Sequence, residues 1–485
     1  MNHASTPSVD GDATGLSSAI AERRLSCERV MRDHLDRIER LNPEFNAIVS
    51  LRDPEALMQD AQAADAALSA GRYGGWLHGL PVAIKDLAET AGLTTTYGSP
   101  LYADNVPDAD CLMAERIRSA GAIFIGKTNT PEFGLGSHTY NPVFGTTRNA
   151  YDPSLSAGGS SGGAAVALAL RLLPVADGSD MMGSLRNPAG WNNIWGFRPS
   201  FGRVPDLPAD ELFLHQLSTS GPMARSVRDL ARLLDTLAGE TEAFPLSLPS
   251  EAESFAAGLD SDVGGLRVGW IGDWGGYYPT DANLLDTTRN GLEALAAQGA
   301  IIEPIEPYFD PALLWKSWMA LRQWSVSAGH AQRYEDAESR EKLKPELRWE
   351  IEGGLRLSAA DIHAASVIRS NWVRWLNGAF SRFDVLALPT AQVFAFDATI
   401  SWPRQIAGRA MDTYHRWMEI VIPGTLSGHP VLAAPAGFDD RGRSIGVQLI
   451  GRPRGDRRLL QIARAYERSA PWIARTPPAI SQAAM

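Results

Sequence analysis

Two serines and a lysine are the residues of this chain whose types could combine in a reaction. Ser160 lies in the glycine-rich run 158–163, Ser184 follows 24 residues later, and Lys85 follows the apolar run 80–84. A serine hydroxyl is a poor nucleophile at neutral pH and needs a base within hydrogen-bonding distance. A lysine that follows a buried strand can be that base, because burial disfavours its charged form. The sequence therefore predicts a hydrolase in which lysine activates a serine.

Lys85 also has a purely structural alternative. Asp86 follows it directly, and the two side chains could form an ion pair that contributes only to stability. To act as a base near neutral pH, Lys85 needs a pKa about three units below its usual value, which costs about 4 kcal/mol and is attainable at a buried site. Arginine at this position separates the two roles, because guanidinium can form the ion pair but cannot accept a proton.

The stretch 121–128 matches the letters of a phosphate-binding P-loop. A P-loop needs a glycine-rich turn whose amides face the phosphate, and a helix that begins at the lysine. Here the variable positions are apolar and favour a strand, and Pro131 opposes a helix soon after Lys127. The sequence therefore argues against nucleotide binding.

Two overlapping Gly-x-Ser-x-Gly matches, centred on Ser160 and Ser161, raise the alternative of a nucleophile elbow. That motif requires a strand directly before the serine and a histidine late in the chain. Residues 151–157 are a poor strand, and His429, the best late histidine, lies in a Gly-His-Pro turn without a recognisable acidic partner. The lysine-dependent interpretation is therefore preferred.

Elements with helical and strand patterns alternate around these residues. Apolar runs bounded by glycine or proline predict buried strands, and apolar residues at helical spacing predict helices. The strands are expected at 81–84, 122–125 and 174–176, and the helices at 16–41, 54–70, 108–120, 164–172 and within the tryptophan-rich region 315–375. A strand, a helix and a strand in succession indicate an α/β fold. The long irregular segment 133–163 is typical of a functional loop.

Composition limits the classes of partner. The chain has 485 residues, 44% of them hydrophobic, which is enough to form a large core. Its formal charge of -11 and the lack of a basic run argue against nucleic acid as a partner. Cys27 and Cys111 are far apart, and no cluster has metal-ligand spacing. We expect neither a disulfide nor a metal nor a cofactor.

The polar start of the chain leads to a prediction about location and domains. Residues 1–15 lack the apolar segment of a signal peptide, and no later segment reaches about 18 consecutive apolar residues. We therefore expect a disordered tail over 1–15, one domain over 16–485, no membrane association and a cytoplasmic location. The acidic stretch 247–264 is expected to be a surface linker, and a homodimer remains open.

Several motifs occur in an order that is typical of one enzyme family. They are Gly-Leu-Pro-Val-Ala-Ile before Lys85, Gly-Lys-Thr-Asn at 126–129, Gly-Gly-Ser-Ser-Gly-Gly at 158–163, Gly-Ser-Leu-Arg at 183–186, Gly-Phe-Arg-Pro-Ser at 196–200 and Gly-Pro-Met-Ala-Arg at 221–225. Together they resemble the amidase signature family, most strongly over 80–225. The resemblance implies a single large mixed β-sheet flanked by helices, with a variable, tryptophan-rich region over about 243–383 on the substrate side.

The resemblance also implies roles for the three residues. Ser184 corresponds to the nucleophile, Ser160 to a bridging serine after a cis peptide bond, and Lys85 to the base. Neutral Lys85 would draw a proton from Ser184 through Ser160, and the alkoxide would attack the amide carbonyl. The proton would pass to the leaving amine, and water would hydrolyse the acyl-enzyme by the same relay.

Residues around the nucleophile are expected to shape the pocket. The family usually has two glycines where this chain has Met181 and Met182, which changes the space around the acyl group but still leaves backbone N–H groups for an oxyanion hole. The expected oxyanion-hole and substrate-binding residues are Met181, Met182, Gly183, Ser184, Gly159 and Trp191, and the expected supporting residues are Ser161, Asp180 and Arg186.

The sequence thus predicts an amidase that converts a small or medium amide to a carboxylate and an amine or ammonia. The two methionines and the tryptophan-rich region favour an apolar or aryl substrate. Alternatives within the family are a carbamate, ester or hydrazide hydrolase and the glutamine-hydrolysing subunit of a transfer-RNA amidotransferase, although an apolar pocket argues against glutamine. A non-catalytic binding protein on the same fold is a remote alternative, which the intact lysine and serines oppose.

Overall fold

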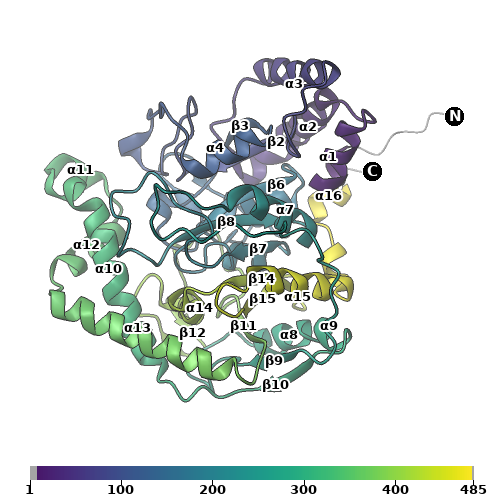
Figure 1. Ribbon diagram of the computed structural model, residues 1–485. Coiled ribbons are helices and arrows are strands. Elements are labelled where there is room, and N and C mark those ends of the chain that lie inside the picture. Colours follow the sequence, from purple (N-terminus) through teal and green to yellow (C-terminus); the bar gives the residue numbers. More distant parts are fainter. Residues whose placement is uncertain (1–7, 483–485) are drawn as a thin grey trace.

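A mixed eight-stranded sheet forms the centre of the molecule (Figure 1). The structure is a computed structural model and describes residues 8–482. The strand order is β10-β9-β11-β15-β14-β7-β8-β6. The strands are β6 (Val175–Asp180), β7 (Trp195–Arg198), β8 (Thr219–Ala224), β9 (Arg267–Trp270), β10 (Ile301–Pro304), β11 (Val385–Pro389), β14 (Val431–Phe438) and β15 (Ser444–Ile450). β9 pairs in parallel with β10 and β11, and the other pairs are antiparallel. The predicted mixed sheet flanked by helices is confirmed.

A second, three-stranded sheet holds the strand that precedes Lys85. Its order is β1 (Ile48–Val49), β3 (Ile123–Thr128), β2 (Pro81–Lys85). β2 and β3 are parallel and are connected through α4 (Leu112–Ser119), which confirms the predicted strand-helix-strand unit. These strands lie outside the eight-stranded sheet, but the Lys85 backbone N–H donates to the Asp177 carboxylate on β6. This contact joins the two sheets at the candidate site.

Helices cover both faces of the sheets (Figure 1). They are α1 (Ala13–Ala21), α2 (Cys27–Phe45), α3 (Pro54–Ser69), α5 (Gly162–Ala169), α6 (Asn187–Trp191), α7 (Val227–Leu237), α8 (Leu284–Gly291), α9 (Glu293–Ala296), α14 (Ile422–Ser427), α15 (Asp456–Arg468) and α16 (Pro478–Gln482). Four more, α10 (Pro311–Glu335), α11 (Ala337–Lys342), α12 (Pro345–Leu355) and α13 (Ala359–Ala379), form a layer at one side and correspond to the predicted helical region 315–375. Short hairpins pair β4 (Tyr140–Asn141) with β5 (Gly145–Thr146) and β12 (Gln405–Ile406) with β13 (Arg409–Ala410).

Two expectations for the start of the chain are corrected. The single helix expected at 16–41 is two helices, because Arg23 has a φ of 57° and the Ser26 side chain caps the start of α2. Residues 8–15 of the expected disordered tail are ordered: a 3-10 turn over Ser8–Asp10 precedes α1, and the Asp10 carboxylate forms ion pairs with two arginines, Arg37 and Arg171. Residues 1–7 lie outside the described part of the chain.

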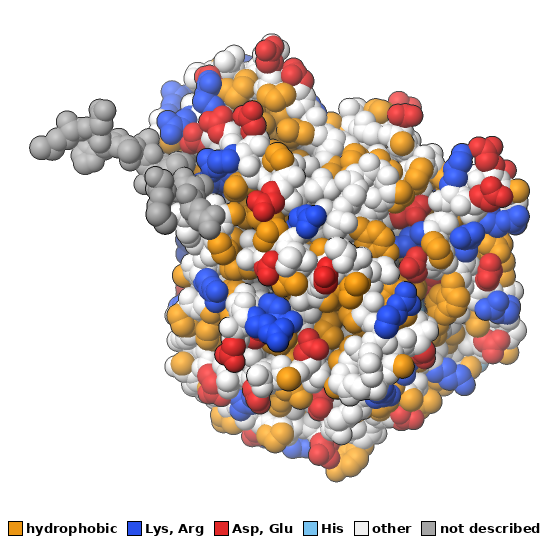
Figure 2. All heavy atoms as spheres, turned by 180° about the vertical axis from the view of Figure 1, so that it is seen from behind, with side chains coloured by type: hydrophobic (Ala, Val, Ile, Leu, Met, Phe, Trp, Pro, Cys, Tyr) orange, Lys and Arg blue, Asp and Glu red, His pale blue; other side chains and the backbone are white. Residues whose placement is uncertain are grey.

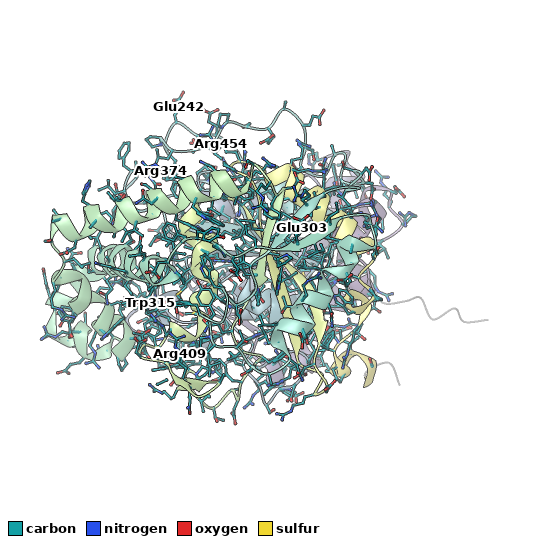
Figure 3. All side chains as sticks on the ribbon, turned by 90° about the horizontal axis from the view of Figure 1, so that it is seen from below. Glu242, Glu303, Trp315, Arg374, Arg409 and Arg454 are labelled. Carbon is teal, nitrogen blue, oxygen red and sulfur yellow. The ribbon has the colours of Figure 1, made fainter. Side chains whose placement is uncertain are left out.

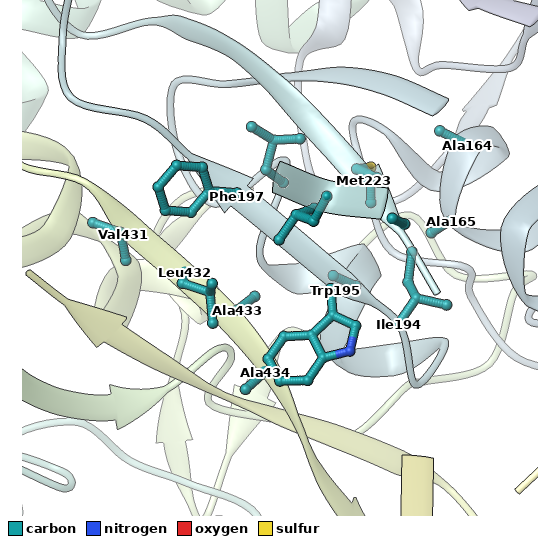
Figure 4. Packing of buried hydrophobic residues seen from close by; sticks show 14 of the residues in the cluster. Ala164, Ala165, Ile194, Trp195, Phe197, Met223, Val431, Leu432, Ala433 and Ala434 are labelled. Carbon is teal, nitrogen blue, oxygen red and sulfur yellow. The ribbon is translucent and has the colours of Figure 1, made fainter. Parts of the chain in front are cut away.

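The core lies between the central strands and the helices (Figure 4). Trp195 and Phe197 of β7 and Met223 of β8 are fully buried and pack near the apolar run Val431–Ala434 of β14. Such uninterrupted apolar runs fit strands that are covered on both faces. Charged side chains such as Arg374 and Arg454 project at the periphery (Figure 3), and one face of the molecule displays charges of both signs among apolar patches (Figure 2).

No helix within residues 8–482 combines the length and apolar character needed to cross a membrane.

Candidate active site

Lys85 is the centre of a buried group of hydroxyls. It is the last residue of β2, and its side chain is 1% exposed. Its Nζ atom lies 2.8 Å from Ser160 Oγ, 2.9 Å from Ser161 Oγ and 3.0 Å from Ser179 Oγ. The Asp86 carboxylate instead accepts hydrogen bonds from the backbone and hydroxyl of Thr96. The Lys85–Asp86 ion pair, the structural alternative for this lysine, is therefore not formed.

Burial makes Lys85 suited to accept a proton. Desolvation lowers the pKa of Lys85 to about 7, and the charges of Asp177 and Asp180 raise it only in part. A substantial fraction of the amine is therefore neutral near pH 7, whereas an exposed lysine is charged there.

Ser160 and Ser161 reach Lys85 through the loop that precedes α5. The Gly159–Ser160 peptide bond is cis. Gly163 in the first turn of α5 packs directly on the backbone that follows β3, where a Cβ atom would lie 2.3 Å from the Asn129 nitrogen. Only glycine permits this approach, which carries the two serines to the end of β2.

Ser184 lies in the turn after β6, and an aspartate organises this turn. The Asp180 carboxylate accepts the backbone N–H groups of Gly183 at 2.9 Å and Leu185 at 3.1 Å. Gly183 has a φ of 84°, a conformation that favours glycine. The Ser184 side chain is 7% exposed and faces a cavity.

The cavity that contains Ser160 and Ser184, here called the serine pocket, has a volume of about 200 Å³. Its wall combines apolar side chains with several serine hydroxyls, Arg322 and His330. The lining includes Leu87, Phe133, Leu135, Met181, Arg322 and Val326. Ser218 and Met181 also line an adjoining cavity of about 480 Å³, and Ser218 and Ser179 line another of about 370 Å³ that reaches Lys85. No hydrogen bond joins the side chains of Ser160 and Ser184 among residues 8–482. The serines share the pocket without direct bonding.

Asp180 and Arg186 form a fully buried ion pair below the turn. Arg186 Nη2 lies 2.9 Å from Asp180 Oδ1, and both side chains are inaccessible to solvent. Burial alone would raise the pKa of Asp180, but Arg186 and Arg198 hold it well below its usual range. The supporting role expected for these two residues is consistent with this position.

Asp180→Asn is expected to lower the free energy of unfolding by about 3 to 5 kcal/mol, because Arg186 would remain buried without its counter-charge. Urea unfolding of wild type and variant at pH 7 measures the difference. Asp260→Asn is the matched control: its ion pair with Arg464 is on the surface, so a loss below about 1 kcal/mol is expected. Equal losses in the two variants would contradict the assigned importance of the buried pair.

Several residues expected at the pocket lie elsewhere. Trp191 is fully buried, donates to the Val393 carbonyl and stacks on Trp417, so it belongs to the core. The side chain of Met182 is also buried in the core, whereas Met181 lines the serine pocket. The Gly183 N–H is bonded to Asp180 and is not free for an oxyanion. Trp191, the Met182 side chain and the Gly183 N–H are therefore corrections to the expected pocket, whereas an oxyanion role for the backbone N–H groups of the two methionines stays a prediction.

Gly159 does not line the pocket either. A Cβ atom at Gly159 would lie 3.1 Å from Thr139 Oγ1 and 3.2 Å from the His138 nitrogen, so this residue packs against the segment 137–139. Ser161, expected to act in support, is instead in direct contact with Lys85.

The structure adds residues that sequence reasoning missed. Ser179 bonds Lys85 Nζ, and Asp177 accepts the Lys85 backbone N–H at 3.1 Å. Both lie on β6, and their alternate positions put them on one face of that strand. His330 of α10 lines the serine pocket, and burial lowers its pKa to about 4. A neutral imidazole near the two serines is a second candidate base.

The lysine of the P-loop match and the late histidine of the elbow alternative both have structural roles. Lys127 lies on β3 and is bonded to the Ala88 carbonyl and the Thr90 hydroxyl, so the P-loop letters form a strand as expected. His429 bonds the Gly451 carbonyl and packs against the Phe380 ring in a tilted arrangement, and it does not line the serine pocket. Neither residue contributes to the candidate site.

Known proteins resemble the chain over nearly its whole length. The family model described as Amidase matches residues 29–460. The chain is 32% identical to an acylamidase of Rhodococcus erythropolis over 477 residues, covering 96% of each chain. It is 33% identical to the A subunit of the glutamyl-tRNA(Gln) amidotransferase of Thiobacillus denitrificans, covering 96% of this chain and 99% of the relative. The solved structure of a bacterial aryl acylamidase of the amidase signature enzymes superimposes with a TM-score of 0.88 at 29% identity, covering 95% of this chain and 96% of the other.

Proposed function

Because the chain belongs to the amidase signature family and is an amidase, we propose that it acts through a serine acyl-enzyme, with Ser184 as nucleophile, Ser160 as bridging group and Lys85 as base. The observation that carries this proposal is the buried contact of 2.8 Å between Lys85 Nζ and Ser160 Oγ. Ser184 opens into the same pocket. Both observations support this assignment of roles.

The proposed reaction needs one proton path. Neutral Lys85 takes the proton of Ser160 as Ser160 takes the proton of Ser184, and the Ser184 oxygen bonds to the amide carbonyl carbon. The proton returns to the leaving nitrogen as the C–N bond breaks, which leaves the acyl-enzyme. Water then attacks the acyl group, loses its proton by the same route, and releases the carboxylate and Ser184.

The apolar part of the serine-pocket wall supports an apolar or aryl substrate. Phe133, Leu135 and Val326 offer apolar contacts close to the two serines. The relatives named acylamidase and aryl acylamidase agree with this choice. Glutamine is the second candidate, because an amidotransferase subunit is equally similar in sequence, but its short polar side chain would leave the apolar contacts of Phe133, Leu135 and Val326 unused.

A serine-directed phosphonofluoridate tests the nucleophile. We expect a single covalent label on the peptide that contains Ser184, located by mass spectrometry after proteolysis. A label on Ser160 or Ser161 would revive the nucleophile-elbow interpretation. Rates on matched anilides, aliphatic amides, carbamates, esters, hydrazides and glutamine then rank the substrate classes, with anilides expected first.

Exhaustive chelation is expected to leave kcat/KM unchanged within about twofold, because the proposed proton path uses only lysine and serine side chains. Within residues 8–482 no group of three or more His, Cys, Asp or Glu side chains is placed to hold a metal ion. Dialysis against a chelator followed by assay, with and without added zinc, checks this expectation. Activity that disappears on dialysis and returns with zinc would overturn the proposed serine mechanism.

A further inference from the structure

Arg322 of α10 is a buried cation in the wall of the serine pocket. Its side chain is 6% exposed and lines the same cavity as Ser160 and Ser184. Two sides of its guanidinium are held by the protein: Nε donates to Glu350 Oε1 at 2.6 Å, and Nη2 donates to the Tyr414 hydroxyl at 2.7 Å. Glu350 belongs to α12, which lies beside α10 (Figure 1). These bonds fix the direction of the third nitrogen.

The third nitrogen, Nη1, has a poor acceptor. It lies 3.1 Å from the Sδ atom of Met181, the pocket residue that replaces a family glycine. A thioether sulfur accepts hydrogen bonds only weakly. A charged, buried donor without a good acceptor is costly, so an oxygen atom that reaches Nη1 gains more than an ordinary hydrogen bond.

The charge of Arg322 is already balanced. Glu350 is fully buried, and although burial favours its neutral form, Arg322 and His415 lower the pKa of Glu350 to about 2. The Tyr414 hydroxyl donates to the same carboxylate oxygen at 2.6 Å. A substrate carboxylate would therefore bring an unbalanced negative charge into the pocket, whereas a neutral oxygen would not.

We propose that Arg322 is a specificity-determining residue whose Nη1 donates a hydrogen bond to a neutral oxygen on the non-reacting part of the substrate. This inference deepens the proposed function and rests on it, because the same pocket holds the serines. It specifies the substrate class as apolar or aryl amides that carry an ether, carbonyl or hydroxyl oxygen at a fixed distance from the amide carbonyl. The oxygen would take the place of the Met181 sulfur.

A series of matched anilides tests the inference. In one series a single ether oxygen replaces each methylene of the acyl chain in turn, from the third atom onward; in a second series the oxygen moves along a substituent on the amine side. For the wild-type protein we expect kcat/KM to rise roughly 10- to 100-fold over the all-carbon parent at one position. A terminal carboxylate placed at the same distance is expected to give no such gain. If kcat/KM of every ether substrate in both series stays within about twofold of the all-carbon parent, or if the carboxylate is preferred, the inference is overturned.

Two variants test whether Arg322 causes the preference for the ether substrate. Arg322→Met combined with Glu350→Gln removes both charges together, so no buried charge remains unpaired, and the ether preference is expected to fall to about one. Met181→Leu removes the sulfur but retains Arg322, and is expected to keep or increase the preference. Retention of the preference in the double variant, or its loss in Met181→Leu, would contradict the role of Nη1. If the double variant does not fold, the wild-type series and the Met181→Leu variant still test the role of Arg322 Nη1.

The phosphonofluoridate label separates this inference from the proposed function. A label on Ser184 together with a flat ether series would reject only the role of Arg322. A label on another residue would reject the proposed nucleophile, whatever the ether series shows.

Discussion

Ser184→Ala is expected to lower kcat by at least about a thousandfold, because the hydroxyl forms the covalent bond to the substrate. The fold and the substrate Kd are expected to change little. The turn around Ser184 is held by the Asp180 carboxylate, which accepts the Gly183 and Leu185 backbone N–H groups rather than a bond from Ser184. Single-turnover rates on an anilide, substrate binding by calorimetry and thermal unfolding measure the three quantities.

Neighbouring serines provide matched controls for this substitution. Ser179→Ala removes a hydroxyl that also contacts Lys85 but takes no part in bond formation, so its loss of kcat is expected to be much smaller. Ser160→Ala is expected to be nearly as inactive as Ser184→Ala, because it interrupts the proton path. More than about a tenth of wild-type kcat in Ser184→Ala would remove Ser184 as the nucleophile.

Local sequence could predict that Lys85 is buried at the end of a strand, but it did not predict the residues of β6 that contact it. An apolar run bounded by glycine and proline predicts a buried strand, and the residue at its end shares that burial, as Lys85 does in β2. Ser179 and Asp177 were missed because the strand was expected only at 174–176, whereas β6 continues to Asp180. Their spacing of two along β6 places both on the face toward Lys85.

The position of Trp191 could not be predicted from local sequence. It follows the nucleophile by seven residues, but α6 turns its ring into the core, where it stacks on Trp417, a residue far along the chain. Packing between segments so distant in sequence leaves no local pattern. Closeness in sequence to Ser184 was therefore a poor guide to the pocket.

The residues of α10 that line the pocket do show a helical spacing in the sequence. The interpretation of this region used its tryptophans instead. Trp318 and Trp372 are fully buried in the core, although they prompted the expectation of an aromatic substrate side. The residues of α10 that line the serine pocket are Arg322, Ser325, Val326, Gly329 and His330. Their spacing of three, four, seven and eight from Arg322 is that of one helix face. This face, rather than the tryptophans, borders the two serines.

The pH dependence of kcat/KM distinguishes the two candidate bases. The pKa of Lys85 is lowered by burial to about 7 and that of His330, also by burial, to about 4. A base works in its neutral form, so activity is lost as the pH falls through the pKa of the base. With Lys85 as base, kcat/KM is expected to fall about tenfold per unit below pH 7 and to level off above it. A profile that stays level from pH 8 to pH 5 and falls only near pH 4 would assign the role to His330.

Substitution of Lys85 completes this test and is expected to have an effect as large as that of Ser184→Ala. Lys85→Ala should abolish most turnover, and Lys85→Arg should not restore it, because guanidinium stays charged at any usable pH and cannot take the Ser160 proton. His330→Gln is the control in the same pocket, and we expect its kcat/KM to fall below pH 7 as that of the wild type does. Rate profiles from pH 4 to 9 and thermal unfolding of all three variants give the comparison. A folded Lys85→Arg variant with near wild-type kcat/KM would show that position 85 needs only a positive charge, and the proton relay would then be wrong.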